Sequence, residues 1–177
     1  MKKQIIIPTV ALFIICLVAT ALLALANNVT APIIEKNSAE SEAKSRMEVL
    51  EEAKSFEDKT CGKISYAVGL DENGQTVGMI FTTTSKSYGG DLVVMTGVDT
   101  EGSITGIQIL QISDTAGLGM KAQTDSFKDQ FKGLAAAAVT LNSEVQQVAS
   151  ATVSSTAAVT AVNSAIDAYA AITGKGA

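Results

Sequence analysis

An uncharged apolar run near the start of the chain limits its architecture more than any other feature. Residues 5–26 read IIIPTVALFIICLVATALLALA and hold no Asp, Glu, Lys or Arg. At a helical rise of about 1.5 Å per residue the run spans about 33 Å, enough to cross the hydrocarbon core of a bilayer. Pro8, Thr9 and Thr20 are tolerated in such a helix. The run predicts one membrane-spanning helix.

A cleaved secretory signal is the alternative interpretation of the same run. Lys2 and Lys3 precede it, and Ala24 and Ala26 offer a small-residue cleavage site. The run exceeds the roughly 7–15 apolar residues of a signal core, which favours an uncleaved anchor. Both interpretations leave the two lysines in the cytoplasm and the rest of the chain on the other side. We therefore expect a single-pass cell-membrane protein with an extracytoplasmic C-terminal domain.

Composition excludes several classes of function. The formal net charge of −5 argues against nucleic-acid binding, which needs a basic face. The sequence has no His, which excludes Ser-His-Asp and Cys-His catalysis and most zinc sites. Of two cysteines, Cys16 lies in the apolar run, and Cys61 alone cannot hold an iron–sulfur cluster. Any redox chemistry must therefore use an organic cofactor.

A charged segment follows the apolar run and predicts a solvated stalk helix. Residues 32–58 begin with Pro32, which suits a first helical turn. A narrow apolar stripe follows at helical spacing, formed by Ala39, Ala43, Met47 and Leu50. The chain is thus expected to divide into a cytoplasmic tip with the membrane helix at 1–28, a stalk helix at 29–60 and an extracytoplasmic domain at 61–177.

From Lys63 onward, short β-type runs alternate with turn signals. KISYAVGL and TVGMIFTTT flank DENGQ, in which Asn73-Gly74 predicts a tight hairpin with a pair of positive φ angles. DLVVMTGV and SITGIQILQI flank DTEG, a second hairpin signal. These four strands, with helical segments after them, predict an α+β domain built on a compact antiparallel sheet with flanking helices.

Helices and loops are expected after the strands. Gly117 and Gly119 bracket Leu118 in a loop, and TDSFKDQF predicts a short helix capped by Thr124 or Asp125. GLAAAAVTLN, residues 133–142, predicts a further strand or a buried turn. A final helix over about 155–172 is expected to pack on the core through one apolar face, formed by Val159, Val162, Ile166, Tyr169 and Ile172.

A cluster of hydroxyl side chains precedes this final helix. Ser150, Thr152, Ser154 and Ser155 stand where the helix is expected to begin, with Thr152 just outside it. A helix N-terminus presents unpaired N–H groups and the positive end of the helix dipole, so it favours an anion such as phosphate. The alternative is that Ser154 or Ser155 caps the helix and the others are turn residues. Spacing alone leaves both interpretations open.

Three stretches resemble the FMN-binding subunits of membrane redox pumps. SATVSS resembles their SGAT-type motif, and SYGGDLVVMTGVDTEGSITGIQIL resembles their GYGG stretch and the hairpin after it. DTAGLGMKAQTDSFKDQFKG resembles their ETPGLG loop and the FxxQFxG segment beyond it. The family includes the G subunit of the Rnf complex, which the short chain and compact loops favour, and the C subunit of the Na+-translocating NADH:quinone oxidoreductase.

The resemblance implies a set of cofactor-binding residues. Thr152 matches the threonine that carries FMN through a phosphoester bond. Thr115, Gly117, Leu118 and Gly119 match the loop that lies against the flavin, and Lys121 stands just beyond it. Hydroxyls near the attachment point would bind phosphate oxygens, namely those of Ser150, Ser154 and Ser155. The chain departs from the family pattern with Ser150 in place of Gly, Asp114 in place of Glu, and Gln146 in place of Asp.

The resemblance also implies a function and partners. The chain would relay electrons, as a non-autonomous subunit, in a pump that oxidises ferredoxin, reduces NAD and moves Na+ or H+. Its partners would be the other membrane subunits of the Rnf complex and the flavin transferase that attaches FMN. An extracellular flavoprotein carrier and a membrane-anchored scaffold domain without flavin are the alternatives. Gln146 favours the scaffold, because the transferase is thought to recognise the Asp that it replaces.

Overall fold

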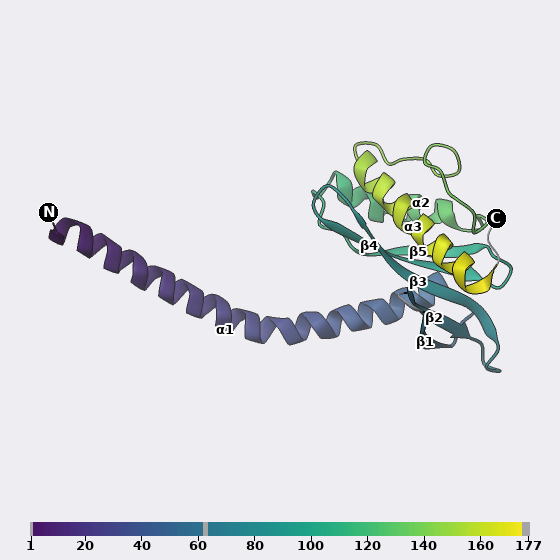
Figure 1. Ribbon diagram of the computed structural model, residues 1–177, viewed down its shortest axis with the longest axis horizontal. Helices are drawn as coiled ribbons and strands as arrows, with labels where there is room; N and C mark the ends of the chain where they lie inside the picture. The colour runs from purple at the N-terminus through teal and green to yellow at the C-terminus, as the bar shows by residue number, and fades with distance from the viewer. Residues whose placement is uncertain (1, 62–63, 175–177) are drawn as a thin grey trace. The chain divides into compact units, whose positions relative to one another are not determined.

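The computed structural model describes residues 2–61 and 64–174, so Lys63 at the start of the first expected strand lies outside the described residues. The chain forms two compact units, Met1–Ser41 and Glu42–Ala177. The elements are α1 (Lys2–Val49), β1 (Ser55–Cys61), β2 (Ile64–Leu70), β3 (Thr76–Lys86), β4 (Asp91–Asp99), β5 (Ile104–Gln111), the 3-10 helix η1 (Gly119–Gln123), α2 (Asp125–Lys128), the 3-10 helix η2 (Asp129–Phe131) and α3 (Thr152–Thr173). The expected α+β class is confirmed (Figure 1).

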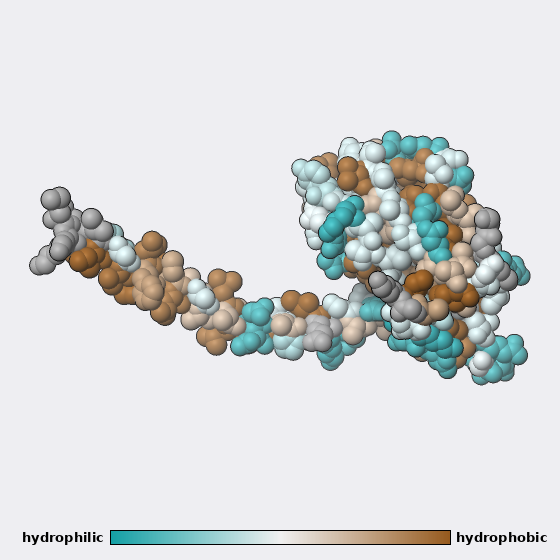
Figure 2. Space-filling view, viewed as in Figure 1, coloured by the Kyte–Doolittle hydropathy of each residue, from teal (hydrophilic) through white to brown (hydrophobic). Residues whose placement is uncertain are grey.

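α1 contains the apolar run and continues beyond it. By length and composition it is the one helix of the described chain that could cross a membrane. The large apolar side chains between Ile6 and Ile34 are exposed, and they colour the first part of the helix brown in Figure 2. Pro32 lies inside the helix and does not begin a new one, contrary to the expectation of a separate stalk helix.

The expected stalk helix also ends earlier than the sequence indicates. α1 stops at Val49, and the last residues of the expected stalk form a turn and β1. Val49 and Leu50 are each 2% exposed, because they pack against the sheet beside Ile80 and Met95. β1 was missed because it is an edge strand with almost every side chain in solvent, so its polar composition resembles that of a solvated helix.

The sheet is a five-stranded antiparallel meander in the order β1-β2-β3-β4-β5. The four strands expected from the sequence are β2 to β5, and β1 adds a fifth. The β2–β3 and β4–β5 turns have the same pattern, with Asp at the first position of the turn and Gly at the fourth. Asp71 accepts hydrogen bonds from the N–H groups of Asn73 and Gln75, and Gly74 has φ +76°. Asn73 does not have positive φ, so the expected pair of positive φ angles is wrong.

α3 covers one face of the sheet, lying across β3 and β4 (Figure 1). The expected apolar face of the helix is confirmed: Val159, Val162, Ile166 and Tyr169 are buried and Ile172 is partly buried. Two β3 hydroxyls fasten the helix by donating to its backbone, Thr83 to the Ala161 carbonyl at 2.8 Å and Ser85 to the Ala157 carbonyl at 2.7 Å. These bonds fix the position of α3 along β3.

The segment between β5 and α3 is largely irregular. α2 begins after Thr124 as expected, although the Thr124 side chain makes no cap hydrogen bond. Phe127 and Phe131 point into the core and contact each other edge to face, with ring centroids 5.5 Å apart. Residues 133–142 form turns and isolated bridges and no strand. Of the two alternatives for this segment, a strand or a turn, the structure therefore has the turn.

Thr96 on β4 provides a test of how the core is packed. Its side chain is 0% exposed, and among the described residues its hydroxyl has no hydrogen-bond partner. A buried unpaired hydroxyl costs about 1–3 kcal/mol, so Thr96→Val is expected to raise the free energy of unfolding by about 1 kcal/mol. Urea denaturation of the detergent-solubilised chain measures the change. Thr83→Val, which removes a hydroxyl that is bonded, should be destabilising, and a destabilised Thr96→Val would contradict the prediction.

Candidate functional site

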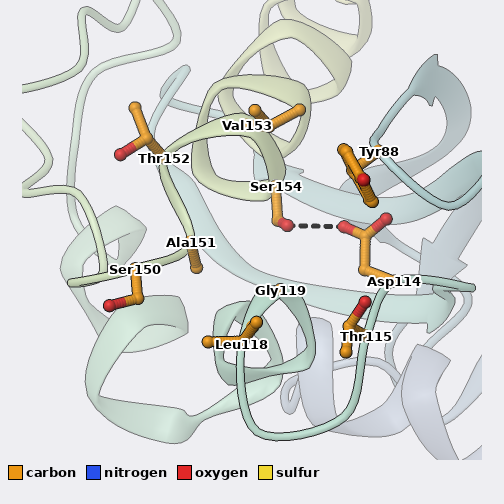
Figure 3. Close-up of a pocket in the computed structure, with 10 residues that line it drawn as sticks. All are labelled: Tyr88, Asp114, Thr115, Leu118, Gly119, Ser150, Ala151, Thr152, Val153 and Ser154. Atoms are coloured by element: carbon orange, nitrogen blue, oxygen red, sulfur yellow. Dashed lines mark hydrogen bonds between the residues drawn. The ribbon is translucent and has the colours of Figure 1, made fainter.

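A cavity of about 420 Å³ opens beside the start of α3. Three segments form it: the loop between β3 and β4, the loop that precedes η1, and residues 150–154. Figure 3 shows the residues that line it: Tyr88, Asp114, Thr115, Leu118, Gly119, Ser150, Ala151, Thr152, Val153 and Ser154. The sheet and α3 thus bring together segments that lie far apart in the sequence.

The N-terminus of α3 forms one side of the cavity and has no side-chain cap. The helix begins at Thr152, so Thr152 is its first residue, and the expectation that it lies just outside the helix is wrong. Ala151 occupies the cap position, so neither Ser154 nor Ser155 caps the helix. The N–H of Ser155 donates to the Ala151 carbonyl at 2.8 Å. The helix offers no carbonyl acceptor to the N–H groups of its first residues, Thr152, Val153 and Ser154. The first turn also contains no acidic residue, so this end of the helix is suited to an anion.

The three hydroxyls on the first turn of α3 differ in exposure and in hydrogen bonding. Thr152 is exposed, and its hydroxyl points away from Asp114 in Figure 3. Ser154 is 2% exposed and donates to an Asp114 carboxylate oxygen at 2.5 Å. Ser155 is fully buried, accepts from the Val148 N–H at 3.1 Å and does not line the cavity. Thr152 is therefore the hydroxyl of the first turn that a reagent can reach.

Ser150 has an unusual backbone conformation for its residue type. Its φ is +66°, in the left-handed region that costs a residue with a side chain about 1 kcal/mol relative to Gly. Gly, which the SGAT-type motif has at this position, adopts positive φ without this cost. Ser150→Gly is expected to raise the free energy of unfolding by about 0.5 kcal/mol, because the relief of this strain exceeds the extra entropy that Gly loses on folding. Urea denaturation measures this, and a clearly less stable variant would contradict it.

The glycine loop, Asp114–Gly119, forms the second side of the cavity. Gly117 has φ +78° with open space around it, so its role is conformational. Gly119 has a different role: a Cβ there would lie 2.5 Å from the Asp114 Cβ and 2.6 Å from the Ser154 Oγ. Of the residues that the resemblance assigns to this loop, Thr115, Leu118 and Gly119 line the cavity. Gly117 and Lys121, also expected in the site, do not line it.

Asp114 connects the three segments that form the cavity through hydrogen bonds. The sequence does not predict this role. Its side chain is 6% exposed, and it accepts hydrogen bonds from the Ser154 and Ser87 hydroxyls and, at 2.6 Å, from the Gly89 N–H. Burial alone would raise the pKa of this carboxyl, but the bonds from Ser154, Ser87 and Gly89 outweigh it and lower the pKa. Asp114 is therefore a carboxylate at neutral pH.

Exposed apolar side chains surround the opening of the cavity. Tyr88 is 80% exposed, Val153 52% and Leu118 49%. Exposed apolar groups gathered around a hollow indicate a binding site, and their combination with a helix N-terminus suits a ligand with a flat apolar ring and a phosphate. Tyr88, Ala151 and Val153 were not among the expected site residues. The SYGG stretch was the sequence signal that could have identified Tyr88.

Two family models match the chain. Residues 87–167, which contain every lining residue, match the FMN-binding domain, and residues 1–49 match the RnfG N-terminal region. The second match covers the apolar run, in agreement with a membrane-anchored protein.

Whole-length relatives agree with these models. The chain is 33% identical to the G subunit of the Na(+)-translocating ferredoxin:NAD(+) oxidoreductase complex of Acetobacterium woodii, over 89% of this chain and 88% of the relative. It is 32% identical to the G subunit of the ion-translocating oxidoreductase complex of Methanosarcina acetivorans, over 94% and 95% of the two chains.

A solved structure shares the fold. NqrC of Shewanella oneidensis superposes with a TM-score of 0.50 at 14% identity, over 65% of this chain and 66% of that one. The likeness concerns the fold alone, whereas the relatives above match nearly end to end. The chain therefore belongs to the family of G subunits of Rnf-type ion-translocating oxidoreductase complexes.

Proposed function

We propose that this chain is the electron-carrying subunit of an ion-translocating ferredoxin:NAD oxidoreductase, and that it holds FMN through a phosphoester to Thr152. The observation that supports the attachment most directly is the position of Thr152. Its hydroxyl is exposed at the uncapped N-terminus of α3 and at the edge of an apolar cavity.

The residues of the site fit the chemical groups of FMN. The N–H groups at the start of α3 have no carbonyl acceptor within the helix and are suited to phosphate oxygens, and the Ser150 hydroxyl is exposed beside them. Leu118, Val153 and Tyr88 offer apolar surface to a ring and exclude water from it. FMN, when bound, supplies transfer of one or two electrons at a time.

The expected membrane orientation explains why a covalent bond to the cofactor would be useful. With Lys2 and Lys3 in the cytoplasm, the domain that contains the cavity lies outside the cytoplasm, where a dissociable cofactor would be lost by dilution. An ester at Thr152 prevents that loss. We infer that a separate flavin transferase supplies FMN in activated form, and that the electron donor and acceptor of this subunit are other subunits of the complex.

A scaffold domain without flavin is the second candidate function, and Gln146 favours it. Its backbone N–H donates to the Gln130 side chain at 2.7 Å, and its own side chain is exposed and thus accessible to a transferase. Gln at this position lacks the negative charge of the Asp found in the family motif. A chain that the transferase cannot recognise would keep its fold and remain unmodified.

Intact mass of the purified chain, co-expressed with a flavin transferase, distinguishes the two candidates. The electron carrier should gain the mass of one FMN less one water, on the peptide that contains Thr152, and its band should fluoresce in a denaturing gel. A dark band with the mass of the bare chain would leave the scaffold as the function.

A further inference from the structure

Asp114 links two walls of the cavity that lie far apart in the sequence. On one side is the wall loop, defined here as Ser87–Gly89. The Ser87 hydroxyl and the Gly89 N–H both donate to Asp114, so both neighbours of Tyr88 are fixed while the Tyr88 side chain stays 80% exposed. The approach is close, because a Cβ on Gly89 would lie 2.1 Å from the Ser113 carbonyl oxygen.

On the other side, Asp114 is held against the first turn of α3. Ser154, two residues after Thr152, donates to the same carboxylate at 2.5 Å, as the dashed line in Figure 3 shows. Gly119 leaves room for this contact, since its missing side chain would occupy the space of the Asp114 and Ser154 side chains. One carboxylate therefore spans from the wall loop to the attachment helix.

The same residue sets the charge of the cavity. Among the described residues that line the cavity, Asp114 alone has a charged side chain. None of the ion pairs of the described chain includes it, and Lys86, the nearest lysine in sequence to the wall loop, pairs with Asp91. Its three hydrogen bonds keep it ionised despite burial. A negative charge that has no ion-pair partner and is shielded from water repels other negative charge nearby more strongly than an exposed charge does.

We propose that Asp114 is a positioning residue that locks the wall loop to the first turn of α3, and that its negative charge lowers the reduction potential of the flavin held in the cavity. The second part rests on the proposed function. The first part concerns the protein alone. The lock keeps Tyr88 at the edge of the cavity, and the charge disfavours the uptake of electrons by repulsion.

The charge is tested by spectroelectrochemical titration of the flavinylated full-length chain. Asp114→Asn, similar in shape but neutral, is expected to shift the midpoint potential upward, and Asp114→Glu, which keeps the charge, is expected to stay near the wild type. Asp129→Asn is the matched control, because that exposed carboxylate does not line the cavity. An unchanged midpoint in Asp114→Asn would overturn the electrostatic part.

The lock is tested without flavin, by amide hydrogen exchange of the chain produced in the absence of the transferase. The Gly89 N–H should exchange about tenfold faster in Asp114→Asn than in the wild type, and faster also in Ser87→Ala, which keeps the charge but loses one bond. Unchanged exchange in both variants would overturn the lock. A wild type that takes no flavin would defeat the proposed function and the charge effect, while the exchange result would still decide the lock.

Discussion

Thr152→Val is expected to abolish covalent flavin completely. Valine has nearly the shape of threonine but no oxygen for the ester bond. The side chain is exposed, and its hydroxyl makes no hydrogen bond to the described residues, so the variant should remain folded. Intact mass should return to that of the bare chain, and the fluorescence of the denatured band should disappear.

Thr156→Val is the matched control for this result. Thr156 is an exposed threonine one turn further along α3, and its hydroxyl donates to the Thr152 carbonyl at 2.8 Å. The control should keep full modification, since Thr156 does not line the cavity and Thr152 keeps its own hydroxyl. Flavin that persists in Thr152→Val would show that the ester is formed elsewhere. Flavin that disappears equally in both variants would show that the loss is not specific to Thr152.

Gly119→Ala is expected to cause the largest loss of stability among the site variants, about 2–3 kcal/mol. The new methyl would lie within 3 Å of the side chains of Asp114 and Ser154, both nearly fully buried, and overpacking of this kind forces neighbours to move. Because those two side chains join the walls of the cavity, the yield of flavin attachment should fall as well. Urea denaturation measures the first effect, and gel fluorescence per mole of protein measures the second.

Gly117→Ala separates this packing effect from backbone strain. Gly117 has positive φ but no atom within 4 Å of an added Cβ, so alanine there should cost only about 1 kcal/mol. A loss in Gly119→Ala no greater than in Gly117→Ala would contradict the close approach between the glycine loop and the start of α3.

The sheet and the last helix could be predicted because their signals are local. β2 to β5 have apolar runs bounded by turn residues, and the apolar face of α3 repeats at helical spacing. β1 could not be predicted in this way, since an exposed edge strand has no apolar alternation to identify it. The early end of α1 was missed for a related reason: Leu50 fits a helical stripe, and its burial against the sheet depends on a contact with distant strands.

The site was foreseen only in part. The resemblance pointed to Thr152 and to the glycine loop, and the cavity includes Thr152, Thr115, Leu118 and Gly119. The sequence position of Ser155 predicts a place in the site, yet the fold buries its hydroxyl as an acceptor for the Val148 N–H. The role of Asp114 depends on donors 25 to 40 residues away, so no local pattern reveals it.

The strand order also has a consequence for how the protein matures. Every strand pairs with its neighbour in sequence, so the sheet can assemble stepwise as the chain emerges. α3 docks on β3 through bonds between residues 72 and 78 positions apart, and its first residues complete the lining of the cavity. A chain interrupted before its last helix would lack part of the cavity lining, so the proposed attachment of FMN would have to follow the docking of α3.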